Sequence, residues 1–255
     1  MEQPPSGQAW YEVWFDSPHY HMVYGHRSQA EADAFIRKMH GTWDWQTLDL
    51  LDLACGKGRH AMAAAALGHQ VTGLDLSPNS IREARSMSAG TSGLTFIEGD
   101  MLDFELPAKF DGVLNLFTSF GYFGSKSELL RVLENIHRHL KPNGFLVLDY
   151  LDASFARKHL TAKETMERNG VTYTIEREIQ HHAEMGWDIF VKRIHHDEGG
   201  IREHHEERVA ALTEVHLREL LETTGFQVVG HYGNYSLDPW VEGESPRLII
   251  KAEKA

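Results

Sequence analysis

Two glycines follow an apolar segment near residue 50, in an arrangement that could hold a cofactor. The leucine-rich segment 48–53 is typical of a buried parallel strand. Gly56 and Gly58 allow a tight turn that brings bare backbone amides close to a ligand. The alanine-rich segment 59–67 predicts a helix that ends at Gly68. A strand, a glycine loop and a helix N-terminus in this order indicate a nucleotide or adenosyl site.

A carboxylate in the same stretch helps to identify the ligand. The spacing of Gly56, Gly58 and Ala61 also fits the dinucleotide-binding fingerprint, so the loop alone leaves two ligand classes open. Asp52 stands at the end of the expected strand, just below the loop, where its charge would repel a pyrophosphate. The same charge suits a ligand that carries an ammonium and a sulfonium, and we therefore expect S-adenosylmethionine.

A second acidic residue ends the next expected strand, at residues 70–75. Asp75 follows Gly58 by 17 residues, close to the spacing of about 20 at which an acid binds ribose hydroxyls. Ser77 and Pro78 are typical of the first residues of a helix. We interpret Asp75 as a ribose ligand; the alternative is an acid that only caps the neighbouring turn.

Strands and helices alternate through the middle of the chain. This rhythm predicts a doubly wound, mostly parallel α/β sheet. A helix at 213–224 is followed by two strands with no helix between them, which predicts an antiparallel hairpin at the sheet edge. A dinucleotide dehydrogenase would instead have a second βαβαβ half. The further expected elements are strands at 94–97, 110–116, 145–150, 226–232 and 247–252, and a helix at 126–140.

The first 40 residues are aromatic and helical in pattern. Trp10 and Trp14 are one helical turn apart, and residues 16–18 would end that helix. A polar and aromatic stretch at 19–27 leads to a second expected helix at 28–40. We interpret this region as a helical cap, which is either a hydrophobic plug on the sheet edge or a lid over an active site.

Within residues 161–211, the segments 171–177, 187–195 and 201–209 alternate polar and apolar side chains and predict three antiparallel strands. A turn at Gly199 and Gly200 would bring four pairs of complementary side chains opposite one another. A hairpin this polar is either a solvated arm or a partner surface, and we favour a contact between subunits. The four pairs are Asp197 with Arg202, His196 with Glu203, Arg193 with Glu206, and Lys192 with Glu207.

Many of the 17 histidines lie in this insertion. The same register places His195 opposite His204, and doublets occur at 181–182, 195–196 and 204–205. A metal site needs three or four converging ligands, whereas neighbours in a strand point to opposite faces. We therefore expect solvated histidines and no functional metal.

Composition excludes several classes of function. The chain has 25 basic and 37 acidic residues, a formal charge of −12, and this disfavours a nucleic-acid partner. Its only cysteine, Cys55, excludes an internal disulfide and fits a reducing compartment. Neither a signal core nor a membrane span is evident in the sequence. We expect a cytoplasmic protein that does not bind membranes.

With these pieces in order, the chain resembles the class I S-adenosylmethionine-dependent methyltransferases. The resemblance covers residues 41–155 and 212–255, and it departs from the family at Ala54, where a glycine is frequent. The matching segments are 51–61, 71–75, 96–101 and 110–117, followed by 140–145.

The resemblance implies a role for residues at four strand ends. Asp52 and the backbone of the glycine loop would face the methionine end of the cofactor. Acidic and apolar residues after the next two strands would bind the ribose and adenine, and residues after the fourth strand would flank the departing sulfur. The implied cofactor residues are Asp52, Ala54, Cys55, Gly56, Gly58, Asp75, Leu76, Asp100, Met101, Asn115, Leu116 and Phe117.

Residues in the cap complete the implied site. Small-molecule members of the family often lay an N-terminal aromatic ring over the cofactor, which here would be Tyr20 or Tyr24. Arg27 could pair with the cofactor carboxylate. His21 or Tyr122 would orient or deprotonate the acceptor, and we assign Cys55 to packing rather than to nucleophilic catalysis.

The resemblance implies in-line transfer of a methyl group to the N or O atom of a small molecule, with S-adenosylhomocysteine as product. Alternatives are a cofactor-binding sensor without turnover, a nucleotide-dependent oxidoreductase, and a protein or nucleic-acid methyltransferase. The insertion would roof the acceptor pocket or form a homodimer. The expected parts are a cap at 1–40, a cofactor-binding core at 41–160, the insertion at 161–211 and the C-terminal part of the core at 212–255.

Overall fold

A computed structural model describes residues 9–25, 28–182, 185–198 and 200–255. Its larger sheet has seven strands in the order β10-β11-β5-β4-β1-β2-β3. The pairs from β3 to β5 are parallel, whereas β11 runs antiparallel to both of its neighbours. The expected doubly wound sheet with an antiparallel terminal hairpin is confirmed. The strands are β1 (Asp49–Leu53), β2 (Gln70–Asp75), β3 (Leu94–Glu98), β4 (Phe110–Asn115), β5 (Leu140–Leu151), β10 (Phe226–Tyr232) and β11 (Arg247–Lys254).

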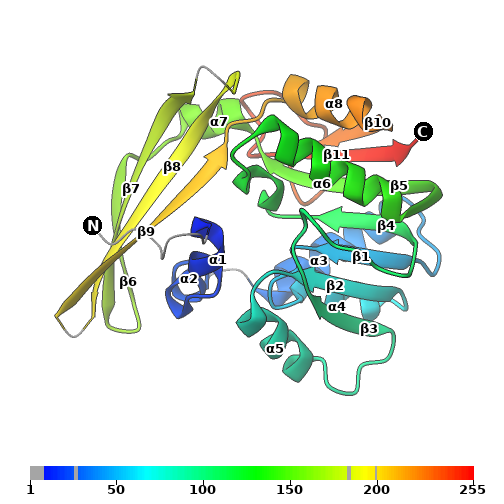
Figure 1. Ribbon diagram of the computed structural model, residues 1–255, viewed down its shortest axis with the longest axis horizontal. Helices are drawn as coiled ribbons and strands as arrows, with labels where there is room; N and C mark the ends of the chain where they lie inside the picture. The colour runs from blue at the N-terminus through cyan, green and yellow to red at the C-terminus, as the bar shows by residue number, and fades with distance from the viewer. Residues whose placement is uncertain (1–8, 26–27, 183–184, 199) are drawn as a thin grey trace.

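Helices cover both faces of this sheet (Figure 1). Alternation along β1 divides the core, because Leu51 and Leu53 pack with α6 and α8 while Leu50 packs with α3, α4 and α5. Asp52 alternates with Leu51 and Leu53 and thus faces the α4 side. The helices are α3 (Gln29–Thr42), α4 (Arg59–Ala65), α5 (Pro78–Met87), α6 (Lys126–His139), α7 (Ala153–Lys158) and α8 (Glu214–Thr223), with a 3-10 turn η1 (Ser119–Tyr122).

The insertion forms a separate antiparallel sheet in the order β6-β7-β8-β9. It has four strands rather than the expected three, because β6 (Lys163–Arg168) pairs with β7 (Val171–His182). The turn between β8 (Trp187–Glu198) and β9 (Ile201–Ala210) gives the expected register, including His195 opposite His204 and Lys192 opposite Glu207. The charge pattern therefore predicted this hairpin correctly.

The N-terminal region divides between two places. Phe35, Ile36 and Met39 of α3 lie in the core against α4. By contrast, α1 (Trp10–Phe15) and α2 (Pro18–Val23) lie between the four-stranded sheet and α5 (Figure 1). One part of the region is thus a layer of the core, and the other part bridges the two sheets.

The expectation of solvated histidines is wrong for the face of the insertion that α1 and α2 cover. His196 is 4% exposed, and its ring stacks on that of His19 with centroids 3.8 Å apart. His205 stacks on Trp14 at 4.4 Å. The helices exclude water from this face, whereas His204 on the opposite face is exposed.

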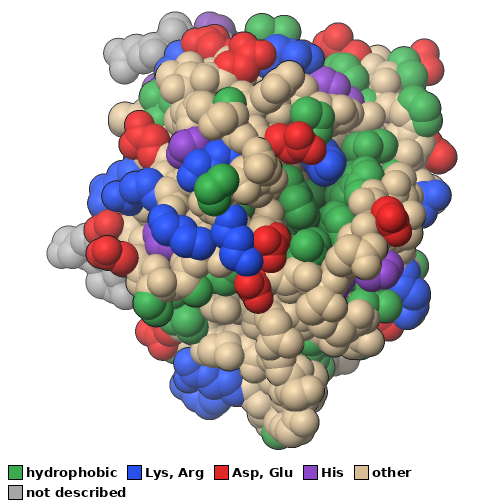
Figure 2. All heavy atoms as spheres, turned by 90° about the vertical axis from the view of Figure 1, so that its right-hand side faces the viewer, with side chains coloured by type: hydrophobic (Ala, Val, Ile, Leu, Met, Phe, Trp, Pro, Cys, Tyr) green, Lys and Arg blue, Asp and Glu red, His purple; other side chains and the backbone are tan. Residues whose placement is uncertain are grey.

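Charges are distributed evenly over the face turned away from the insertion. Figure 2 shows acidic and basic side chains interspersed there, beside a strip of hydrophobic side chains. Opposite charges therefore compensate one another locally on this face. In the part of the chain that the structure describes, each helix is too short or too polar to cross a lipid bilayer.

Candidate functional site

The glycine loop after β1 depends on left-handed backbone conformations. Ala54, Gly56 and Gly58 have φ values of 61°, 54° and 77°. A Cβ atom on Gly58 would lie 2.3 Å from Cζ of Phe96, so only glycine fits there. Ala54 takes a conformation that glycine adopts at lower energy, which explains why glycine is frequent at this position in the family that the sequence resembles. The loop thus turns tightly into α4, and Gly58 allows it to pack closely against Phe96.

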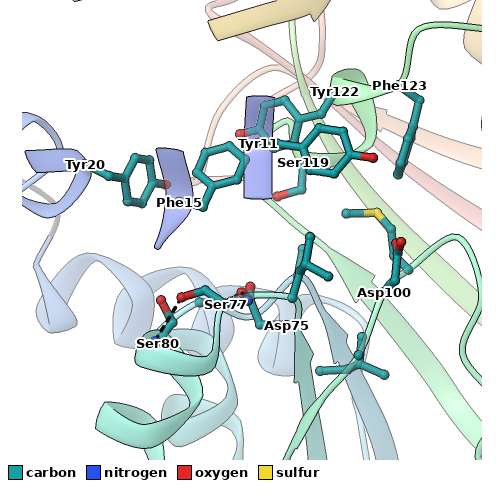
Figure 3. A pocket seen from close by; sticks show the side chains of 16 residues that line it. Tyr11, Phe15, Tyr20, Asp75, Ser77, Ser80, Asp100, Ser119, Tyr122 and Phe123 are labelled. Carbon is teal, nitrogen blue, oxygen red and sulfur yellow. Dashed lines mark hydrogen bonds between the residues drawn. The ribbon is translucent and has the colours of Figure 1, made fainter. Parts of the chain in front are cut away.

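The strand-end cavity lies where β2 and β3 end. Asp75 accepts hydrogen bonds from the amides of Gly56, at 2.7 Å, and of Ser77, at 2.9 Å. Figure 3 shows Asp75, Ser77 and Ser80 on one wall of this cavity and aromatic rings of the N-terminal region facing them. The lining consists of Tyr11, Phe15, Tyr20, Ala54, Gly56, Leu74, Asp75, Leu76, Ser77, Ser80, Gly99, Asp100, Met101, Ser119, Tyr122 and Phe123.

The second cavity, the glycine-loop cavity, has a volume of ≈ 370 Å³ and contains Asp52. Asp52 is 1% exposed, and burial raises the pKa of its carboxyl to about 7. Its Oδ2 atom and the Oδ1 atom of Asn115 are buried and accept no hydrogen bond from the described residues. Buried acceptors of this kind are costly unless a ligand donates to them. A ligand with an ammonium group fits here.

Cys55 behaves as a packed thiol. It is 9% exposed, and burial raises the pKa of its thiol well above the usual value. Its Sγ atom lies 3.6 Å from the carbonyl oxygen of Gly56. A thiol that stays protonated is a poor nucleophile, so these observations support the packing role expected from the sequence.

The third cavity, the insertion cavity, lies beneath the four-stranded sheet and has a volume of ≈ 390 Å³. The idea of a fully solvated hairpin is wrong here, because Glu207 is 6% exposed and Lys192 lies beside it. The lining of the insertion cavity combines aromatic rings with charged side chains of both signs. The residues are Tyr20, Tyr24, Phe117, Thr118, Tyr122, Leu151, Ala156, His159, Leu160, Thr161, Glu164, Arg177, Phe190, Val191, Lys192, Glu207, Val209 and Arg247.

The three cavities meet at two tyrosines. Tyr20 and Tyr122 each line all three, and Tyr24 and Phe117 line both the glycine-loop and the insertion cavities. A ligand that filled the first two cavities would therefore border the contents of the third at these rings.

Most residues implied from the sequence come together around this junction. Leu116 and Cys55 line the glycine-loop cavity, as does His21. His21 does not line the insertion cavity, and burial lowers the pKa of its imidazole. Asn115, by contrast, is fully buried, lines none of the three cavities and donates to the carbonyl of Leu53 at 3.1 Å. Arg27 is outside the described residues.

A buried carboxylate that the sequence did not mark as functional holds the N-terminal helices in place. Glu207 of β9 accepts from Nε1 of Trp14 at 2.6 Å and from the Tyr24 hydroxyl at 2.7 Å. The Tyr24 hydroxyl in turn accepts from Nζ of Lys192 at 2.7 Å. The charge pairing of Lys192 with Glu207 was the only signal in the sequence, and it did not reveal the burial.

The segment between α1 and α2 is fixed to the core. Asp16 accepts from the hydroxyl of Ser77 and from the side-chain amide of Asn79, each at 2.7 Å. Both partners belong to the first turn of α5 or precede it. Residues 10–24 thus form a lid, defined here as α1, α2 and Tyr24, that is attached on both sides of the cavities.

One group of side chains between α2 and the insertion has the composition of a metal site. His19, His196 and Glu203 have ligand atoms within 4.8 Å of one another. The two imidazole rings stack at an angle of 27°, so their nitrogen lone pairs lie in two nearly parallel planes. The expectation that no functional metal binds stays a prediction.

Known proteins resemble this chain in both sequence and fold. Residues 50–144 match the family described as "Methyltransferase domain". The dTDP-3-amino-3,6-dideoxy-alpha-D-glucopyranose N,N-dimethyltransferase of Streptomyces fradiae is 32% identical over 151 residues, which are 58% of this chain and 56% of that protein. The aligned part thus spans just over half the length of this relative.

Two solved structures share the fold at low sequence identity. An S-adenosylmethionine-dependent methyltransferase from Clostridium acetobutylicum has a TM-score of 0.77 and 18% identity, over 92% of this chain and 95% of that one. An S-adenosylmethionine-bound amino pentose methyltransferase from Micromonospora echinaspora has a TM-score of 0.64 and 20% identity, over the whole of both chains. The match to the methyltransferase family thus covers residues 50–144, and the two structures share the fold of the chain as a whole.

Proposed function

We propose that the whole protein transfers a methyl group from S-adenosylmethionine to a nitrogen atom of a small molecule. The observation that carries this proposal is the meeting of the three cavities at Tyr20 and Tyr122. Two of the cavities have the donors and acceptors that this cofactor needs, and the third is large enough for a sugar-sized acceptor.

The residues of the first two cavities fit the cofactor. Asp75 would bind the ribose hydroxyls, because each carboxylate oxygen keeps a lone pair beyond those used by Gly56 and Ser77. Asp100, Met101 and Leu76 would surround the adenine. The bound cofactor supplies an electrophilic methyl group and a neutral leaving group.

The methionine end would lie in the glycine-loop cavity. Asp52 and Asn115 have buried oxygen atoms that would accept from its ammonium group. Tyr20 and Tyr122 present rings at the junction, where a positive sulfonium is attracted to an aromatic face. Arg27 as a partner of the cofactor carboxylate, and Tyr24 as a ring over the cofactor, remain proposals from the sequence.

The protein would position the two reactants and exclude water from them, without forming a covalent bond to either. A neutral amine attacks the methyl carbon with its lone pair, so it must be held in line and kept free of competing water. Tyr122 lies at the junction and is our candidate to orient this amine. His21 lies on the cofactor side, and we retain it as the second candidate for this role or for removing the amine proton.

An amine is the acceptor that the comparison with relatives favours. The carboxylates that line the insertion cavity already have cationic partners, because Glu207 lies beside Lys192 and Glu164 pairs with Arg177, so the charges of the lining do not select the acceptor. The Streptomyces fradiae relative is named as an N,N-dimethyltransferase of an amino sugar linked to dTDP. We therefore propose amino sugars, free or attached to a nucleotide, as the first acceptors to test.

The test uses cofactor with a radiolabelled methyl group. We would incubate the protein with a dTDP-linked amino sugar, with its hydroxyl analogue and with an extract of the source cells, and separate the products by ultrafiltration. Label in the low-mass fraction that depends on the amine supports the proposal. Label on the hydroxyl analogue would indicate an oxygen acceptor instead, and label retained on protein or nucleic acid would overturn the small-molecule assignment.

A variant separates catalysis from simple binding. Asp75→Asn should lose cofactor binding and turnover together, because it removes the proposed ribose ligand. A parent protein that binds S-adenosylhomocysteine but transfers no label to any acceptor would favour a sensor without turnover.

Two further proposals rest on the sequence alone. The first is that the protein acts in the cytoplasm. The second is a homodimer formed through the four-stranded sheet, which sedimentation of the purified protein would test: a monomer at micromolar concentration contradicts it.

A further inference from the structure

Two consecutive residues after β4 adopt a backbone conformation that L-amino acids rarely use. The φ values of Phe117 and Thr118 are 74° and 68°. A left-handed conformation is unfavourable for a bulky residue and especially for a β-branched one such as Thr118. Strain of this kind persists only where the surrounding structure determines it. Contacts with the surrounding residues must therefore hold this turn.

Asp149 of β5 binds both backbone amides of the strained pair. Its Oδ2 atom accepts from the amide of Phe117 at 2.9 Å, and its carbonyl oxygen accepts from the amide of Thr118 at 2.8 Å. Asp149 is 1% exposed. One buried residue thus fixes the direction in which the chain leaves β4.

Arg247 of β11 completes this arrangement. Its Nε atom donates to Oδ1 of Asp149 at 2.7 Å, and its Nη2 atom donates to the Thr118 hydroxyl at 3.0 Å. The guanidinium also lies 5.6 Å from the centre of the Phe117 ring. A third partner, the Tyr235 hydroxyl, donates to Oδ2 of Asp149 at 3.1 Å. Asp149 and Arg247 therefore hold the turn from two neighbouring strands.

The turn forms a wall of every cavity in the site. Phe117 lines the glycine-loop and insertion cavities, Ser119 lines the strand-end and glycine-loop cavities, and Tyr122 lines all three. Asp149 lines none of these three cavities, so it acts on a ligand only through its partners: the turn and Arg247, which lines the insertion cavity.

We propose that Asp149, held by Arg247, is a positioning residue for methyl transfer. It keeps Phe117 and Thr118 in the left-handed conformation and so places Phe117 and Tyr122 where the cofactor meets the acceptor. This inference rests on the proposed function, because it assumes that transfer occurs at that junction.

The test begins with Asp149→Asn, which keeps the size of the side chain but presents an amide where donors converge. At a temperature where the variant is folded, kcat should fall at least tenfold. The dissociation constant of S-adenosylhomocysteine should change less than threefold, because Asp75 and Asp100 lie at the ends of other strands. A purely structural role would lower the unfolding temperature without this difference between kcat and cofactor affinity.

A second substitution that restores activity provides a sharper test of the positioning role. Glycine takes the left-handed conformation without help, so Thr118→Gly added to Asp149→Asn should recover kcat at least threefold. Asn143→Gly is the matched control, because Asn143 also has a positive φ, of 60°, near the other end of β5. Equal recovery with both glycines, or equal losses in kcat and cofactor affinity, would overturn the proposal.

Two additions keep the test decisive. Should Asp149→Asn fail to fold, Tyr235→Phe takes its place, because it removes one hydrogen bond to Oδ2 of Asp149 and Tyr235 lines none of the three cavities; a smaller loss in kcat and the same rescue are expected. Coupling between positions 149 and 118 in the unfolding temperature, measured without any acceptor, supports the holding of the turn even where no amine is methylated. Coupling between the two positions without methylation of any amine would contradict the proposed function but not the positioning role. Absence of both coupling and rescue would contradict the positioning role.

Discussion

Nε1 of Trp14 donates a 2.6 Å hydrogen bond to Oε1 of Glu207, although 193 residues separate the two along the chain. This bond joins the lid to the roof of the insertion cavity. Tyr24 binds the same carboxylate, so both α1 and the C-terminal residue of the lid are attached to β9. The shape of the acceptor site thus depends on a contact between the first helix and the last strand of the insertion.

Glu207→Gln should loosen the lid. The amide would direct an N–H group at Trp14 or Tyr24, and a buried donor without an acceptor costs about 1–3 kcal/mol. We expect KM for the acceptor to rise roughly tenfold, which corresponds to about 1.4 kcal/mol. Steady-state kinetics of methyl transfer to an amine acceptor would measure this KM. Glu206→Gln is the control: Glu206 pairs with Arg193 and Arg208 on the opposite face of the sheet, and an equal effect there would refute the role of the lid.

Cofactor affinity should depend on pH through Asp52. Its pKa of about 7 means that the carboxyl is mostly neutral at pH 6 and mostly ionised at pH 8. Because the cofactor ammonium favours the ionised form, the dissociation constant should fall about tenfold between these pH values. Calorimetric titration with S-adenosylhomocysteine would show this trend. Asp52→Asn should bind weakly at both pH values, whereas Asp49→Asn, at the other end of β1, should keep the trend.

The same raised pKa predicts how stability changes without ligand. Between about pH 4 and 7 the folded protein retains the Asp52 proton that the unfolded chain has released. The contribution of this group to stability therefore falls as pH rises through that window. Denaturant titrations at pH 5 and pH 7.5 would give the change in the free energy of unfolding with pH for the parent and for Asp52→Asn. Equal changes in the two proteins would contradict the raised pKa of Asp52.

Histidine burial should make the protein sensitive to acid. Burial lowers the pKa of His205 to about 4, with the neighbouring His196 and His19 acting in the same direction and Glu203 opposing them. Between pH 6.5 and about 4 the unfolded chain binds a proton that the folded chain does not, so stability is lost as pH falls. His205→Gln should reduce this loss, measured as the change in unfolding temperature between pH 7 and pH 5. His204→Gln, at the exposed neighbour, should leave it unchanged.

Gly58→Ala should disrupt the loop more than an equivalent change elsewhere. Its Cβ atom would lie 2.3 Å from Phe96, in addition to the strain of a φ of 77°. We expect a loss of about 3 kcal/mol in the free energy of unfolding, from overpacking and strain together. Gly68→Ala has open space around its Cβ atom and should lose only about 1–2 kcal/mol. Urea denaturation of both variants would contradict this account if their losses were equal.

The parallel core could be predicted because its signals are local. Apolar runs that end in glycine or acid determine where β1 and β2 stop, and complementary charges determined the register of the β8–β9 hairpin. The strand β6 was missed because its residues, Lys163–Arg168, are mostly exposed and show no alternation of polar and apolar side chains. An edge strand of this kind has no hydrophobic face to mark it.

The rest of the site depends on contacts between distant parts of the chain. Nothing near Glu207 indicates that the lid will cover it, and its partner Trp14 is almost the whole chain away. Asp149 stands within an apolar run, and its partner Arg247 is 98 residues further on. Burial of these charges follows from tertiary packing, which local patterns do not encode.

The attachment of the lid to β9 also has a consequence for synthesis on the ribosome. Trp14 of the lid emerges before Glu207, which follows nearly 200 residues later, on the order of ten seconds or more at typical elongation rates. During that time Trp10, Trp14 and Phe15 lack the surface against which they pack. A nascent chain of this protein therefore carries an exposed aromatic segment until the insertion is complete, and chaperones that bind such segments would meet this one early.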